Sequence, residues 1–252
     1  MSKTRCIIIP AFNEGEQIAS VIDGIRRFTD ADIVVVDDGS RDQTGEKARR
    51  AGAYVIEHPF NIGYGAALQT GYRYALNRGY SYLLQMDGDG QHDPGSIPGL
   101  FREAESGGWD VVLGSRFLGR EPYRAGPLKD SGILVFRILV RLLTGQTITD
   151  PTSGYQCLGR RVFEVFAESD FPWRYPDANI ILQLHLMGFR IKEVPARMVP
   201  NPSGRSMHQG VFRLVYYFFE MFLSLFVTLL RERNEGLAGN RVSRRAHKEP
   251  EG

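Results

Sequence analysis

The sequence has few cysteines and little net charge, and both shortages exclude classes of protein. Its 252 residues contain two cysteines, Cys6 and Cys157, which both lie in apolar, strand-like runs. We therefore expect buried, reduced thiols of a cytosolic protein, and neither a disulfide framework nor a cysteine metal site. The formal net charge of +2 is too small to indicate a nucleic acid as partner.

The sequence also shows no internal repeat and no low-complexity linker. We expect no signal peptide, because the first residues lead directly into a short apolar strand. Its 42% of hydrophobic residues are enough for a complete core and exclude global disorder. We predict one large domain over residues 1–206, an apolar helix over 207–233 and a basic tail over 234–252, which we expect to be disordered.

Short apolar strands alternate with amphipathic helices along the first half of the chain. Such alternation is typical of an α/β fold with a mostly parallel, doubly wound sheet. We expect Pro10 to end the first strand and Asn13 to cap the first helix, over residues 14–28. The predicted strands cover residues 6–9, 33–36, 54–56, 83–86, 111–113, 155–158 and 189–195, the last as an edge strand.

The strand over residues 83–86 runs into two carboxylates, Asp87 and Asp89, with a glycine after each. In an extended segment residues i and i+2 point the same way, so these carboxylates would repel each other unless a cation lies between them. Oxygen ligands of this kind suit Mg²⁺ or Mn²⁺, which usually also hold substrate phosphates. An isolated Asp-x-Asp is more often a polar turn, so the assignment depends on its surroundings.

Polar side chains follow three other predicted strands in the same way. They are Asn13 and Glu14, Asp37 and Asp38, and Ser115 and Arg116. The carboxyl ends of parallel strands meet at one edge of a sheet, where open α/β folds bind their ligands. Four polar strand ends at one edge therefore predict a cleft of nucleotide size.

Six short motifs connect these strand ends with the rest of the chain. They are residues 9–14 (IPAFNE), 36–40 (VDDGS), 61–63 (NIG), 86–92 (MDGDGQH), 114–116 (GSR) and 150–154 (DPTSG). In this order and at this spacing they resemble family 2 glycosyltransferases, over about residues 4–206. Within that family the chain is most similar to the dolichyl-phosphate mannose synthases and their bacterial polyprenyl-phosphate relatives, because Gln91 and His92 follow the Asp-x-Asp.

The resemblance implies the GT-A fold, which binds nucleotide sugars, together with a donor site and a metal site. The implied donor-site residues are Pro10, Phe12, Glu14, Asp38 and Asp87. The implied ligands of Mg²⁺ or Mn²⁺ on the donor diphosphate are Asp87, Asp89 and Gln91. A helix cap is the structural alternative for Asp38, and Gly39 and Gly63 are expected to serve loop geometry.

The resemblance also implies an acceptor site, in which Arg116, Ser131 and Arg205 face a phosphate. A solvated surface charge is the alternative for each arginine. An acceptor phosphate is already an anion at pH 7, so it needs positioning more than a general base. A hydroxyl acceptor would need a base, and Asp177 is the candidate, with a helix N-cap as its alternative. The implied catalytic residues are therefore Asp89, Arg116 and Asp177, in a single displacement that inverts the anomeric carbon.

Three functions remain open on the sequence. The leading hypothesis is metal-dependent transfer from a nucleotide sugar to a polyprenyl phosphate, at the cytoplasmic face of the cell membrane. The second is transfer to a saccharide hydroxyl in cell-surface polysaccharide synthesis. The third is a non-catalytic nucleotide-binding or Mg²⁺-binding module, which would not need Asp87, Asp89 and Arg116 together.

Residues 211–230 are mostly apolar and long enough to span a bilayer. However, Glu220 near their middle would be costly in lipid, whereas Tyr216 and Tyr217 suit a membrane interface. The basic tail that follows favours an anionic lipid surface. We expect an interfacial or re-entrant helix. The alternatives are a helix that packs against the core or against a second subunit of a homo-oligomer, and a helix that spans the membrane.

Overall fold

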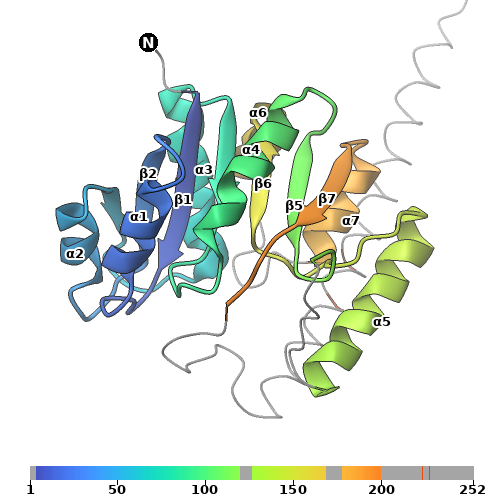
Figure 1. The fold of residues 1–252 in the computed structure, drawn as a ribbon, viewed down its shortest axis with the longest axis horizontal. Helices are drawn as coiled ribbons and strands as arrows, with labels where there is room; N and C mark the ends of the chain where they lie inside the picture. Colours follow the sequence, from blue (N-terminus) through green and yellow to red (C-terminus); the bar gives the residue numbers. More distant parts are fainter. Residues whose placement is uncertain (1–3, 120–126, 169–177, 200–222, 224–226, 228–252) are drawn as a thin grey trace, which may run out of the picture.

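The computed structural model describes residues 4–119, 127–168 and 178–199, together with Leu223 and Val227. The strands are β1 (Arg5–Ala11), β2 (Asp32–Asp37), β3 (Tyr54–Glu57), β4 (Tyr82–Gln85), β5 (Val111–Ser115), β6 (Gln156–Gly159) and β7 (Ile191–Pro195). The helices are α1 (Ile18–Arg26), α2 (Thr44–Arg50), α3 (Tyr64–Arg78), the 3-10 helix η1 (Pro94–Ser96), α4 (Ile97–Glu105), α5 (Pro127–Thr144), α6 (Arg160–Glu168) and α7 (Ala178–Leu186). Within these residues the strands form one sheet, in the order β3-β2-β1-β4-β6-β5-β7 (Figure 1).

The sheet is parallel except at β6, which confirms the predicted mostly parallel, doubly wound α/β fold. Strand β6 pairs antiparallel with both of its neighbours, β4 and β5. The pairs β1–β2, β1–β4, β2–β3 and β5–β7 are parallel. Strands β4 and β5 therefore run in the same direction. The carboxyl ends of β1, β2, β4 and β5 lie at one edge of the sheet, as the four polar strand ends predicted.

Helices cover both faces of the sheet and enclose two cores (Figure 1). Along β1, Cys6 and Ile8 face the core under α3, α5, α6 and α7, whereas Ile7 and Ile9 face the core under α1, α2 and α4. This alternation is what a strand covered on both faces requires. The second cysteine, Cys157, lies in the other core, and both thiols are buried and free, as predicted.

Strand β1 continues through Pro10, where the sequence predicted its end. The carbonyl of Ala11 accepts a hydrogen bond from the backbone N–H of Asp38, 2.8 Å away on the β2 side. Neighbouring residues in a strand direct their backbone groups to opposite sides, so Pro10 directs its nitrogen toward the β4 side. Strand β4 has already ended there, at Gln85. The proline therefore removes no hydrogen bond from the ladder, which is the condition for proline inside a strand.

Helix α1 begins at Ile18, later than predicted, and Asn13 does not cap it. Asn13 adopts φ +57°, a left-handed conformation that asparagine tolerates better than most residues. Its backbone N–H donates to Ser40 Oγ (2.9 Å), and its Oδ1 accepts from the backbone N–H of Arg41 (2.8 Å). Asn13 thus ties the loop after β1 to the loop after β2, and so joins two of the polar strand ends.

The predicted C-terminal segments fall mostly outside the described residues. This holds for the boundary at residue 206, for the basic tail over 234–252 and for most of the apolar segment over 207–233. Leu223 and Val227 of that segment are described, and both are exposed. In the part of the chain that the structure describes, no helix is both long and apolar enough to cross a membrane.

Candidate active site

A chain of hydrogen bonds leads from the core to Asp87, the first carboxylate after β4. The buried Tyr72 hydroxyl donates to Gln85 Oε1 (2.6 Å), and Gln85 Nε2 donates to Tyr64 Oη (3.4 Å). The Tyr64 hydroxyl in turn donates to Asp87 Oδ1 (2.8 Å). About a third of the Asp87 side chain (31%) remains exposed. The polar chain therefore orients one oxygen of Asp87 and leaves the carboxylate accessible at the sheet edge.

The second carboxylate, Asp89, lies close enough to Asp87 for the two charges to interact. Burial raises the pKa of Asp89, and the negative charge of Asp87 raises it further. Burial also raises the pKa of Asp87, against the Tyr64 hydrogen bond and the charge of Arg116, which lower it. The backbone N–H of Gln91 donates to Asp89 Oδ1 (3.0 Å). A bound cation would relieve this strain between like charges.

These residues fit a divalent cation that is shared with a substrate phosphate. Mg²⁺ usually takes one or two protein carboxylates and completes its shell with water and phosphate oxygens. Asp87 and Asp89 supply two carboxylates, and Gln91 lies two residues further along the same turn. Among the described residues, no cluster of three or more histidine, cysteine or acidic side chains is placed to hold a metal by itself. Asp87 and Asp89 are the residues that would hold Mg²⁺ or Mn²⁺.

His92 is a buried, neutral support for this turn. Burial lowers its pKa to about 4, and the charge of Arg116 acts in the same direction. Its Nδ1 accepts the backbone N–H of Asp87 (3.0 Å), so the proton of the neutral ring sits on Nε2. The ring stacks on Tyr155, with centroids 4.6 Å apart and an interplanar angle of 14°. His92 therefore fixes the backbone of Asp87 and is not poised as a base.

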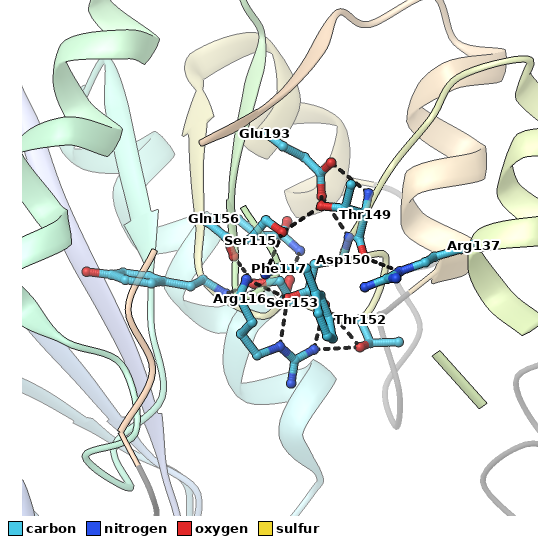
Figure 2. Close-up of polar contacts among 12 residues, drawn as sticks. Ser115, Arg116, Phe117, Arg137, Thr149, Asp150, Thr152, Ser153, Gln156 and Glu193 are labelled. Carbon is cyan, nitrogen blue, oxygen red and sulfur yellow. Dashed lines mark hydrogen bonds and ion pairs between the residues drawn. The ribbon is translucent and has the colours of Figure 1, made fainter. Parts of the chain in front are cut away.

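Arg116, directly after β5, forms a bidentate ion pair with Asp150 (Figure 2). Its Nε donates to Oδ2 (2.6 Å) and its Nη2 to Oδ1 (2.5 Å), while Nη2 also donates to Thr152 Oγ1 (2.7 Å). The Asp150 side chain is fully buried, and that of Arg116 is 16% exposed. The same turn ends at Gly154, where an added Cβ would lie 3.6 Å from Asp87 Oδ2. The ion pair after β5 and the carboxylates after β4 therefore belong to one site.

The structure gives Asp38 a supporting position after β2. The carboxylate is buried, and its Oδ1 contacts His58 Nδ1 (2.6 Å) and accepts the backbone N–H of Ile62 (3.0 Å). Its Oδ2 accepts the backbone N–H of Gly63 (2.8 Å). These contacts hold the loop before α3. Asp38 thus anchors the start of α3 and does not cap α2, the helix that follows it in sequence.

The two glycines predicted to serve loop geometry do so. Gly39 has φ +71°, and a Cβ there would lie 2.5 Å from the carbonyl carbon of Phe60. Gly63 has φ +125°. The loop before α3 therefore passes so close to the end of β2 that residue 39 can carry no side chain.

The donor residues predicted after β1 reach the same edge. Pro10 is buried inside the strand, Phe12 is exposed, and Glu14 is half-buried. The backbone N–H of Glu14 donates to Thr44 Oγ1 (2.9 Å), which fixes this loop against the start of α2. The exposed Phe12 ring and the fixed loop offer an apolar surface and a defined backbone beside the ends of β1 and β2.

Of the residues predicted for the acceptor side, Arg116 is placed as described above. Ser131 lies exposed near the start of α5. Asp177 and Arg205 lie outside the described residues, although Asp177 directly precedes α7.

A cavity of about 350 Å³ adjoins the end of β2 on the side of α2 and β3. Four carboxylates line it, namely Asp37, Asp42, Glu46 and Glu57. Two of them are paired with arginines, Glu57 with Arg49 (2.9 Å) and Glu46 with Arg50. The remaining negative charge, on Asp37 and Asp42, opposes a diphosphate, so the donor phosphates are better assigned to the end of β4.

Sequence comparison agrees with this geometry. The profile of the family described as "Glycosyl transferase family 2" matches residues 6–166. The chain belongs to this family. It is therefore an enzyme, a glycosyltransferase, and not a non-catalytic binding module.

Relatives of this glycosyltransferase include two enzymes named for lipid-phosphate acceptors. The chain is 30% identical over 213 residues to an undecaprenyl-phosphate mannosyltransferase of Micrococcus luteus, covering 81% of this chain and 86% of the relative. It is 28% identical over 214 residues to a UDP-N-acetylglucosamine–dolichyl-phosphate N-acetylglucosaminyltransferase of Methanococcus voltae, covering 77% and 84%.

A solved structure of similar fold is glucosyl-3-phosphoglycerate synthase of Mycobacterium tuberculosis, in complex with Mn²⁺ and UDP-glucose. The TM-score is 0.66 at 22% sequence identity, over 90% of this chain and 79% of that one. This likeness shows the fold, which is the GT-A fold predicted from the motifs.

Three polar residues of this family 2 glycosyltransferase were not given a role by sequence reasoning. His92 belongs to the motif over residues 86–92, and Asp150 to the motif over residues 150–154. Membership of these motifs is the sequence signal that could have identified both residues. Tyr64 follows the motif over residues 61–63, but nothing in the sequence links it to Asp87. Its role depends on where the first turn of α3 meets the end of β4.

Proposed function

We propose that this glycosyltransferase transfers a sugar from a nucleotide-sugar donor to a polyprenyl phosphate, with inversion at the anomeric carbon and with Mg²⁺ or Mn²⁺ as cofactor. The observation that carries the proposal is the joining, at one sheet edge, of a carboxylate pair after β4 and an ion-paired arginine after β5. The two relatives named for undecaprenyl phosphate and dolichyl phosphate support the acceptor class.

On the donor side, Asp87 and Asp89 would hold the divalent cation against the diphosphate. When bound, the cation would stabilise the negative charge of the departing nucleoside diphosphate. Tyr64 keeps one oxygen of Asp87 oriented, and His92 holds its backbone. This support means that the carboxylates need little rearrangement when the donor arrives.

On the acceptor side, Arg116 supplies positive charge and Asp150 fixes the plane of its guanidinium group. A phosphate oxygen forms the new bond to the anomeric carbon, and the electrons of the breaking carbon–oxygen bond leave with the nucleoside diphosphate. Because the acceptor is already ionised at pH 7, this displacement needs no proton acceptor. The neutral His92, whose Nδ1 is occupied, suits such a site better than one built for a hydroxyl acceptor.

We further propose that the enzyme works at the cytoplasmic face of a membrane. The apolar run over residues 211–230 and the basic tail support this placement. So does α5, which exposes Leu134, Ile138 and Leu142 along one side, close in sequence to Ser131. Flotation of the full chain with anionic liposomes tests the proposal, and a monomer that stays with the soluble fraction would contradict it.

A donor screen tests the transfer itself. The purified full chain is incubated with UDP-, GDP- and dTDP-sugars, a polyprenyl phosphate and Mg²⁺ or Mn²⁺, and the lipid product is identified by mass spectrometry, its anomeric configuration by NMR. We expect a glycosylated lipid phosphate, loss of turnover with chelator, and loss of turnover in Asp89→Asn. The exposed Asp23→Asn on α1 is the matched control and should leave turnover unchanged.

Transfer to a saccharide hydroxyl, with none to the lipid phosphate, would contradict the proposed acceptor. In that case Asp177→Asn should abolish turnover, because a hydroxyl acceptor needs a base. Unchanged turnover of Asp89→Asn with every donor would contradict the metal assignment.

A further inference from the structure

Glu193, in the middle of β7, holds the turn that carries Asp150 (Figure 2). Its Oε2 accepts the backbone N–H of Thr149 (2.7 Å), and its Oε1 accepts the backbone N–H of Asp150 (2.7 Å). Oε1 also accepts the Thr149 hydroxyl (3.1 Å). One carboxylate thus binds two successive peptide N–H groups, which fixes the orientation of the turn as well as its position.

Two other elements hold the same turn through Thr149. The hydroxyls of Thr149 and Ser115, at the end of β5, lie 2.7 Å apart. Nε of Arg137, on α5, donates to the Thr149 carbonyl, and its guanidinium group lies 4.0 Å from the centre of the Phe117 ring. Glu193 differs from Ser115 and Arg137 because it also accepts the backbone N–H of Asp150 itself (Figure 2).

Because the turn carries Asp150, its fixed position also fixes the guanidinium group of Arg116. The buried Asp150 side chain meets the Arg116 guanidinium in two parallel hydrogen bonds and also accepts the backbone N–H of Arg116 (3.0 Å). The positive charge of Arg116 acts on Asp87, where it lowers the pKa that burial raises. A line of contacts therefore runs from the edge strand β7, through the turn, to the guanidinium group of Arg116.

We propose that Glu193 is a positioning residue for the acceptor anion, acting through the backbone of Thr149 and Asp150 to hold the guanidinium group of Arg116. The identity of that anion rests on the proposed function, whereas the positioning of Arg116 does not. A bidentate arginine presents a phosphate with a fixed pattern of donors only if its own plane is fixed. Glu193 therefore sets the affinity for the acceptor and leaves the donor site untouched.

Glu193→Gln tests the proposal, because glutamine keeps the size of the side chain but replaces one accepting oxygen with an NH₂ group. Two properties of the full-length variant are measured. The first is solvent exchange of the Arg116 Nε–H, followed by NMR and assigned with Arg116→Lys. The second is the KM for polyprenyl phosphate and, separately, for the nucleotide sugar.

We expect exchange of the Arg116 Nε–H to accelerate roughly tenfold, as for the loss of one hydrogen bond. The KM for polyprenyl phosphate should rise by a similar factor, about tenfold, while the KM for the nucleotide sugar stays unchanged. The matched control is Glu103→Gln on α4. Glu103 binds Lys192 (2.5 Å), the neighbour of Glu193 on β7, so this variant removes an ion pair from the same strand without touching the turn. It should change neither property.

A folded Glu193→Gln variant with wild-type exchange at Arg116 would overturn the positioning role. Equal increases in both KM values would overturn the acceptor-specific role, because they would indicate a general structural defect. If Glu193→Gln does not fold, Glu193→Asp keeps the charge but shortens its reach, and should shift both properties in the same direction. A wild-type enzyme that never uses polyprenyl phosphate would refute the proposed function, while the exchange measurement would still decide the role of Glu193.

Discussion

Replacing Asp150 with asparagine should destabilise the enzyme far more than the loss of a surface charge. The Asp150 side chain is completely buried, and the Arg116 side chain is only 16% exposed. The variant keeps the shape of the side chain but leaves the guanidinium group without its countercharge. Removing one partner of a buried ion pair costs about 3–5 kcal/mol, a large part of the stability of a typical domain. For a domain of this size that corresponds to a fall in Tm of roughly 6–20 °C.

Urea denaturation of the full chain, followed by circular dichroism, measures this loss as a change in the free energy of unfolding. The control is Glu46→Gln, which removes the exposed partner of Arg50 on α2. That pair lies in water, so its loss should cost about 1 kcal/mol or less.

A second comparison separates the unpaired charge from the lost contact. In the double variant Arg116→Gln, Asp150→Asn no charge is left without a partner. It should therefore be more stable than Asp150→Asn alone, although it carries one more substitution. The reasoning is refuted if Asp150→Asn unfolds within about 1 kcal/mol of the wild type, or if the double variant is the less stable of the two.

Two further predictions concern stability. Gly39→Ala should lower the free energy of unfolding more than Gly79→Ala does, as measured by urea denaturation. Both positions have positive φ, but only a Cβ at residue 39 meets the Phe60 backbone. We expect a loss of about 1 kcal/mol for Gly79→Ala and of several kcal/mol for Gly39→Ala, and equal losses would contradict this. Burial raises the pKa of Glu193 above its ordinary value of 4.5, so the folded state holds that proton more tightly than the unfolded state. The stability that this proton provides is complete below the ordinary pKa and lost as the pH rises through the raised pKa. The difference in unfolding free energy between wild type and Glu193→Gln should therefore shrink as the pH rises from below 4.5 through the raised pKa, and a difference that grows as the pH rises would contradict the assignment.

The sheet and its polar edge could be predicted because they depend on local patterns. Continuous apolar runs mark strands buried on both faces, and parallel strands bring their carboxyl ends together whatever the details of pairing. The ends of individual elements were predicted less well. Strand β1 passes through Pro10 because β4 stops early on that side, and no feature of residues 5–11 reveals where β4 stops.

The carboxylate pair Asp87 and Asp89 could be found from the sequence because its two members are neighbours in the chain. The proposed acceptor side could be found only in part. Arg116 was identified by its motif, but its partner Asp150 lies 34 residues away, and Glu193 lies a further 43 residues beyond that partner. Such pairings depend on how β5, β6 and β7 pack, which residue spacing does not encode. Asp38 is a similar case, since its motif did not indicate that its oxygens bind the loop before α3.

The single antiparallel strand, β6, also has a consequence for how the chain folds. Strands β1, β2 and β3 pair across single short helices, as in Cys6 with Asp32, whereas β4 and β6 pair with strands far along the chain, as in Leu83 with Cys6 and Cys157 with Leu84. Closing a longer loop loses more chain entropy, so distant pairings form late. We therefore expect β1, β2 and β3 to pair first. The site is completed only when β4 has joined β1 and β6 has inserted between β4 and β5, so slow folding and early local opening should both be concentrated around β6.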